Sequence, residues 1–264
     1  MMAPGPHSPS RMIAYRLILA AAVLAAWEFA SGRLVEEFFI SRPSAILAAF
    51  QRLIVTGNLF FHAGVTATEA FAGFVIGGTA GIVAGILLGR ITFLADLLQP
   101  FILAFYSLPK IALAPLFVLW IGIGMGMKIV LTATVVFFLV FLNTFTGVRS
   151  VSRELVTIVR LMGANERHVL GKIVLPSAIT WVFAGLRISV PYALIGAIVG
   201  ELIAANRGLG FVLASASGQF DTAGVFAALI AIMILAFTLN ALVRAAEAWL
   251  MPWKTSEAAR EVTI

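Results

Sequence analysis

The side chains of this chain that could do chemistry are few, and their spacing fits neither catalysis nor metal binding. The 264 residues contain no cysteine, and the histidines His7, His62 and His168 are scattered, without the spacing of metal ligands. No nucleophile with an adjacent general base stands out among the polar residues. The run GIGMGMK at 122–128 lacks the glycine before the lysine and the Ser or Thr after it that a phosphate-binding loop needs. We therefore expect no catalytic residue, no metal and no cofactor bound by this chain.

Two cations are better candidates, because each interrupts a long apolar window. Lys110 lies between Pro109 and Pro115, and Arg187 stands in LRISVP. An unpaired cation facing lipid costs at least ~2.5 kcal/mol, so each must be paired or face water. Broken helices are tolerated where freed carbonyls meet protein or a water-filled cavity; a merely kinked helix is the alternative. Of the two cations, we favour a structural role for Arg187 and a place on a path for anions for Lys110. The candidates for the translocation path are Pro109, Lys110, Pro115, Arg187 and Glu201.

The composition places these residues in a membrane protein with several spans. Hydrophobic residues make up 61% of the chain, more than a soluble domain of this length can bury. Apolar windows long enough to cross ~30 Å of hydrocarbon predict six transmembrane helices and an all-α fold. A cleaved signal peptide is the alternative for the first window. The windows are Met12–Ala30, Ala70–Gly89, Phe101–Ile121, Ile129–Val148, Leu175–Gly200 and Ala223–Val243.

The distribution of Lys and Arg predicts the orientation. With both termini in the cytoplasm, eleven of the 18 cations lie inside and two lie within spans. The opposite orientation would reverse this bias, against the positive-inside rule. The spread of cations over loops argues for membrane topology rather than nucleic-acid binding. The five placed outside are Arg33, Arg42, Arg52, Lys128 and Arg207.

The second window carries glycines at every fourth position, which predicts a face for close helix packing. The sequence does not say whether the neighbouring helix belongs to the same chain or to a second copy. The five glycines are Gly73, Gly77, Gly81, Gly85 and Gly89.

Outside the spans, the chain predicts two tails and one short helix. Residues 1–10 are rich in Pro and Ser and are expected to form a disordered tail, and residues 255–264 a cytoplasmic one. Residues 11–254 are expected to form a single transmembrane domain. Ser44 is expected to cap an interfacial helix at Ala45–Ile54, with a plain loop as the alternative.

The charged segment at 150–176 predicts two short helices that form a compact unit in water. Arg160, Arg167, His168 and Lys172 would be expensive in lipid, so this segment must lie outside it. Helical stretches at Ser152–Met162 and Asn165–Lys172 flank Gly163, whose backbone permits a tight turn. Pro176 is expected to end the loop and to begin the next membrane helix.

This segment resembles the EAA loop of ABC-importer permeases, whose core is G-x9-I-x-L-P. Further similarities to the nitrate, sulfonate and taurine permease family span roughly residues 40–215: SRPS, LPKIALAPL, NTFTGV, GLR, and Glu201 followed by GLG. Thr157 stands at the position where the motif usually begins with an acidic residue. We expect docking of the ATPase to survive this difference, with altered affinity. The residues that the resemblance assigns to the docking loop are Thr157, Arg160, Gly163, Ala164, Ile173, Leu175 and Pro176.

The resemblance implies the transmembrane permease subunit of an ATP-driven importer with a type I ABC importer permease-like fold. It implies a cytoplasmic ATPase subunit that binds the ATP, an external substrate-binding protein, surrounding lipid and a second copy of the chain. The implied location is the bacterial inner membrane, and the implied solute is small and anionic or sulfonate-like. An ion-gradient-driven secondary transporter is the alternative, although no inverted repeat is evident.

Overall fold

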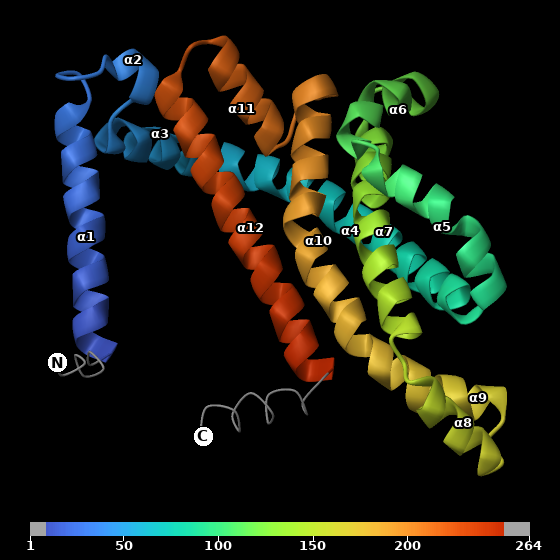
Figure 1. Cartoon of the computed structure of the whole chain (residues 1–264). Helices are drawn as coiled ribbons and strands as arrows, with labels where there is room; N and C mark the ends of the chain where they lie inside the picture. Colours follow the sequence, from blue (N-terminus) through green and yellow to red (C-terminus); the bar gives the residue numbers. More distant parts are fainter. Residues whose placement is uncertain (1–8, 251–264) are drawn as a thin grey trace. The chain divides into compact units, whose positions relative to one another are not determined.

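A computed structural model describes residues 9–250, and the named elements within them are all helices (Figure 1). Five helices are long and apolar enough to cross a membrane, and the number is six if one bent helix pair counts as a single span. The predicted all-α membrane fold is confirmed. The elements are α1 Pro9–Ala30, α2 Glu37–Ile40, α3 Pro43–Val55, α4 Asn58–Arg90, α5 Thr92–Ser107, η1 Lys110–Leu113, α6 Ala114–Ile121, α7 Met125–Arg149, α8 Arg153–Leu161, α9 Glu166–Val169, η2 Leu170–Val174, α10 Leu175–Ala204, α11 Leu209–Gly218 and α12 Thr222–Leu250.

Most of both predicted tails lies outside the described residues. Residues 1–8 and 251–264 are not described, and with them go His7 and the predicted cytoplasmic cations Lys254 and Arg260. Pro9 and Ser10, assigned to the N-terminal tail, already belong to α1. The described chain divides into two compact units, one taking residues up to 60 and 212–231, the other 61–211 and from 232 onward.

Within the first unit, the prediction for Ser44 is half right. The expected helix exists as α3, but the residue at its N-cap position is Arg42, and Ser44 lies inside the first turn. Ser44 instead binds the carboxylate of Glu28 on α1, through its backbone N (3.0 Å) and its Oγ (2.7 Å). Glu28 is thereby satisfied by two donors from α3. Ser44 therefore links two helices instead of capping one.

In the second unit, α4 packs its glycine ladder against α7 of the same chain. A Cβ added at Gly73 would lie 2.5 Å from the side chain of Thr132, and one at Gly85 would lie 2.7 Å from Thr144. At Gly77 the obstacle is the backbone of Ala133 itself. Gly81 and Gly89 meet α7 in the same way. The two helix backbones approach closely because these residues have no side chain, which is the packing expected between helices in lipid.

Glycines of α10 also pack closely against α7. A Cβ at Gly185 would lie 2.8 Å from Asn143, one at Gly196 2.9 Å from the Cα of Thr132, and one at Gly200 2.7 Å from Lys128. Helix α7 is thus held between two glycine-bearing helices, and Val136 and Val140 at its middle are fully buried. This packing fixes the frame from which the candidate site extends.

The predicted span Phe101–Ile121 is not one helix. Helix α5 begins earlier, at Thr92, and ends at Ser107, and the helical segment Lys110–Ile121 continues at an angle of 80°. Pro109 lies at the break, with Leu108 before it in extended conformation (φ −65°, ψ 134°), as proline imposes on the residue that precedes it. Pro115 lies in the first turn of α6, where proline is tolerated, and so does not break a helix.

Pro176 lies in the first turn of α10, as expected, but no break in the helix precedes it. Residues Glu166–Ala204 form one continuous helical run, and Pro176 lies inside it. The turn before it, η2, is π-helical, with the backbone N of Leu175 donating to the carbonyl of Leu170. A π-turn widens the helix at the point where the proline ring would clash with the preceding carbonyl. The proline is therefore accommodated by a local change of helix type.

Candidate functional site

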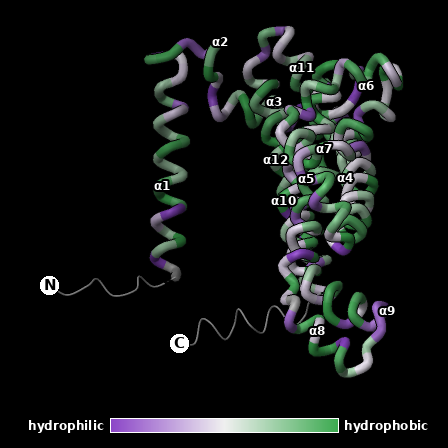
Figure 2. Tube along the Cα trace, turned by 45° about the vertical axis from the view of Figure 1, so that its right-hand side comes forward, coloured by the Kyte–Doolittle hydropathy of each residue, from purple (hydrophilic) through white to green (hydrophobic). Residues whose placement is uncertain are grey.

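Helices α8 and α9 form a compact unit beyond the ends of α7 and α10, which we call the knob (residues 152–169; Figures 1 and 2). Ser152 caps α8 by accepting from the backbone N of Leu155 (3.2 Å), and Asn165 caps α9 by accepting from the N of His168 (3.0 Å). Both caps are side-chain oxygens that satisfy free helix N–H groups. The first predicted short helix is therefore present as α8. The second, predicted at Asn165–Lys172, is the beginning of the continuous helical run Glu166–Ala204.

Gly163 supplies the turn between the two helices. Its φ is +87°, and its backbone N donates to the carbonyl of Arg160 (2.9 Å) while the N of Ala164 donates to that of Val159 (3.2 Å). These two bonds make a Schellman motif, which ends a helix with a residue in left-handed conformation. A Cβ at Gly163 would meet no atom within 4 Å. Glycine is therefore required here by the backbone conformation and not by lack of space.

An apolar cluster roots the knob in the membrane-spanning helices. Val148 of α7, Val169 of α9 and the buried residues Val174 and Ala178 form its centre. Ala164 packs against it, as does Ile86 of α4. Of the residues that the resemblance assigns to the docking loop, Ala164 therefore contacts the cluster and Ile173 is buried, whereas Leu175 and Pro176 are exposed.

The opposite end of the knob is an exposed apolar tip. Leu161 is 83% exposed and Met162 81% exposed, next to the turn at Gly163. Two large apolar side chains therefore lie exposed at the end of a segment that is otherwise rich in charged residues. The motif comparison by sequence missed both residues, although their position directly before Gly163 was the available signal.

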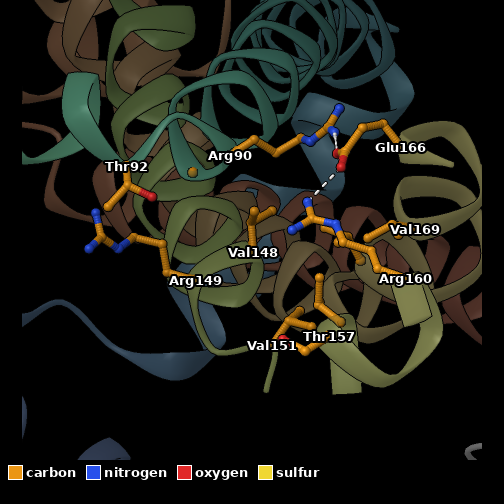
Figure 3. A pocket seen from close by; sticks show the side chains of 12 residues that line it. Arg90, Thr92, Val148, Arg149, Val151, Thr157, Arg160, Glu166 and Val169 are labelled. Carbon is orange, nitrogen blue, oxygen red and sulfur yellow. Dashed lines mark hydrogen bonds and ion pairs between the residues drawn. The ribbon is translucent and has the colours of Figure 1, made fainter. Parts of the chain in front are cut away.

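A polar pocket of about 360 Å³ lies where the knob meets the ends of α4 and α7 (Figure 3). Thr157 and Arg160 of α8 line it together with Arg90, Arg149 and Glu166. The carboxylate of Glu166 accepts from Arg160 (2.6 Å) and from Arg90 (3.0 Å), as the dashed lines in Figure 3 mark. The pocket is therefore lined by three arginines and one acidic side chain, and two of the arginines, Arg90 and Arg160, pair with that acid.

Lys110, the predicted lining of a path, is partly buried at the bend between α5 and α6. Its Nζ donates to the carbonyl of Tyr106 and lies over the rings of Tyr106 (4.7 Å) and Phe138 (4.9 Å). An ammonium over aromatic faces is stabilised by the ring quadrupoles. These contacts let a cation persist at a break in a span.

Arg187 is paired, as an intramembrane cation must be. Its guanidinium contacts the carboxylate of Glu247 on α12, and its side chain is still 42% exposed while that of Glu247 is 7% exposed. Glu247 lies four residues beyond the predicted end of the last window, which is why the pair was not foreseen. Arg187 is consequently held by an ion pair, while part of its side chain remains exposed.

Glu201, one of the path candidates, belongs to a buried polar network. It is 1% exposed and accepts from Thr66 Oγ1 (2.7 Å) and from the backbone N of Gly210 (2.6 Å). The N of Leu209 donates to Thr66 (2.8 Å), and that of Gly208 donates to His62 Nδ1 (3.0 Å). Three consecutive backbone donors at the start of α11 are thereby satisfied by side chains of α4 and α10.

A buried ion pair joins α4 to α7. Lys128 is 3% exposed and contacts the carboxylate of Glu69, which is fully buried. The sequence placed Lys128 in an outside loop, but helix α7 begins three residues earlier, at Met125, and takes the lysine into the protein. A buried charge is tolerated because it is paired. Within residues 9–250, no group of three or more His, Asp or Glu side chains is arranged to hold a metal ion.

Comparison with known proteins gives the same family from several directions. Residues 77–253 match the model of the binding-protein-dependent transport system inner membrane component. The chain is 32% identical to SsuC of Bacillus subtilis, named as a permease for aliphatic sulfonates, over 91% of this chain and 87% of that one. It is 31% identical to the taurine transport system permease protein TauC of Escherichia coli, over 86% and 84%.

Further matches extend the range of named solutes and support the fold. The formylaminopyrimidine transport permease protein ThiX of Halalkalibacterium halodurans is 34% identical over 88% of this chain and 92% of that one. The inward-facing MetNI methionine ABC transporter matches the structure with a TM-score of 0.58 over 72% of this chain and 97% of that one, at 20% identity. At that identity the likeness concerns the fold alone.

Proposed function

Because this chain belongs to the family of binding-protein-dependent transport system inner membrane components, we propose that it forms the path for a small anionic, sulfonate-like solute. The chain is a permease subunit of an ABC importer and a multi-pass protein of the inner membrane. Such a subunit works with an ATPase and a substrate-binding protein. The solute, the docking residues and the orientation are the parts that we infer.

The knob is the proposed docking surface for the ATPase. Its support is a combination of rigid form and exposed apolar tip: two capped helices, a Schellman turn at Gly163, and Leu161 and Met162 exposed at the end. A knob of this kind can enter a groove and move as one body. Thr157 and Arg160 lie on α8 within the knob. The knob therefore forms although Thr157 stands where the motif usually has a carboxylate.

The positions of the cations support an anionic solute. Lys110 and the exposed side of Arg187 supply positive charge within spans, where such charge is otherwise rare. Two of the relatives are named for sulfonates or for taurine, which carries a sulfonate group. Selection among solutes is left to the binding protein, and this subunit passes what is delivered.

A second copy of the chain is the proposed partner across the path. Helix α10 exposes Trp181, Arg187, Ile188, Tyr192 and Ile195, a stripe that mixes polar and apolar groups. Such a mixed stripe suits a helix that faces another copy around a wet path better than it suits lipid. In this arrangement both termini and the knob lie in the cytoplasm, as the distribution of Lys and Arg predicts.

The test is reconstitution in lipid vesicles with the cognate ATPase and substrate-binding protein. We expect the permease to retain the ATPase during purification and to take up a sulfonate only when ATP and the binding protein are present. Uptake driven by an ion gradient without the ATPase would contradict the proposal. Competition between a sulfonate and an uncharged isostere tests the solute class separately.

A further inference from the structure

We propose that Glu166 is a positioning residue that ties the knob to the end of α4 and so passes movement of the docked ATPase to the packed α4–α7 pair. The inference rests on the proposed function, because it concerns how docking is coupled to the spans. It goes further by naming the side chain that carries the coupling and the span that receives it.

The contacts of Glu166 make it a bridge between three helices. Glu166 opens α9, and its two carboxylate oxygens are used separately: Oε1 accepts from Arg160 Nη2 of α8 (2.6 Å) and Oε2 from Arg90 Nη2 (3.0 Å). Arg90 is the last residue of α4. Charge-assisted hydrogen bonds of this kind fix direction as well as distance. Figure 3 shows the carboxylate between the two guanidinium groups.

The other contacts between the knob and α4 do not fix direction. Ile86 of α4 meets the knob through the apolar cluster at its root, and apolar contact is non-directional, so it permits the surfaces to slide. The third arginine of the pocket, Arg149, pairs with Asp96 of α5 (3.0 Å) and serves a different helix. Glu166 is thus the acidic group of this pocket that sets the orientation of the knob on α4.

The two ion pairs of the bridge are also weak enough to allow the knob to move relative to α4. The side chains of Glu166, Arg160 and Arg90 are 61%, 54% and 34% exposed. An exposed ion pair shifts an equilibrium by less than about fivefold, so two pairs on one carboxylate bias a movement without locking it. We therefore expect loss of the bridge to lower coupled uptake by about threefold to tenfold while the protein still folds.

The experiment is a double-mutant cycle in vesicles containing the ATPase and binding protein. Glu166→Gln and Arg90→Gln should each lower solute uptake per ATP hydrolysed by about threefold to tenfold, with the ATPase still retained on purification. The double variant should be no worse than either single one, because both remove the same bridge. Glu36→Gln is the matched control: Glu36 is an exposed acid outside the knob whose side chain caps no helix, and its neutralisation should leave uptake unchanged.

Additive losses in the cycle, release of the ATPase by Glu166→Gln, or an equal loss in Glu36→Gln would each overturn the bridge. If the unsubstituted protein shows no ATP-driven uptake, the proposed function itself falls, which is a different result.

Discussion

Gly77→Ala is the sharpest test of how α4 and α7 are held together. The added methyl group would lie 2.9 Å from the carbonyl C and the Cα of Ala133 and closer still to its carbonyl O. All three are backbone atoms of α7, so no side chain can rotate to make room. The helices must therefore separate, and the same movement loosens the neighbouring contacts at Gly73 and Gly81.

The magnitude follows from that separation. Restoring ordinary contact requires α4 and α7 to move apart by about 0.5–1 Å, a gap that forfeits a quarter to a half of each contact's attraction. Overpacking of this kind costs about 1–3 kcal/mol. Replacing glycine by alanine inside a helix returns at most ~1 kcal/mol. We expect the free energy of unfolding of Gly77→Ala to fall by about 1–3 kcal/mol relative to a glycine without this contact.

Gly64→Ala on the same helix provides that reference, because a Cβ there meets no atom within 4 Å. Unfolding in mixed micelles with increasing SDS, followed by circular dichroism, gives the two free energies. Gly64→Ala should be unchanged or slightly stabilised, and Gly77→Ala clearly destabilised. Equal stabilities of the two variants would refute the packing of α4 on α7 described above.

Three further substitutions test other parts of the structure. Gly163→Val forces a β-branched residue to φ +87° and should uncouple uptake from ATP hydrolysis, whereas Gly163→Asn should be milder; equal uptake by both variants would refute the turn's role. Lys110→Gln should slow uptake of an anion several-fold without releasing the ATPase, and Lys110→Arg should retain most of it, as measured in vesicles. Lys128→Met leaves Glu69 buried without its cation and should cost about 3–5 kcal/mol in SDS unfolding, much of which Glu69→Leu should recover in the double variant.

The spans and the helix–turn–helix of the knob could be predicted from sequence because their causes are local. Length and apolarity decide a crossing, and a cap, a glycine and a second cap decide the knob. The bend at Pro109 was foreseen as a disturbance, but its angle of 80° depends on what the two halves pack against. Pro176 misled because a π-turn, set by the surrounding helix, removed the clash that a proline normally causes.

The polar networks could not be predicted because their partners are distant in the chain. Lys128 stands at the edge of an apolar window and was read as a loop residue, while its partner Glu69 lies on another helix. The donors to Glu201 come from Thr66 and Gly210, on separate elements. Only the packing of α4, α7 and α10 brings these groups together.

The continuous helical run from Glu166 to Ala204 makes its two ends share one angular register. Its 39 residues would span about 58 Å at 1.5 Å per residue, with Glu166 at one end and Glu201 near the other. Each inserted or deleted residue would rotate one end against the other by about 100°. Substitutions along this stretch can therefore be absorbed locally, whereas a change of length would turn either the arginine pocket or the donors at Gly210 out of alignment.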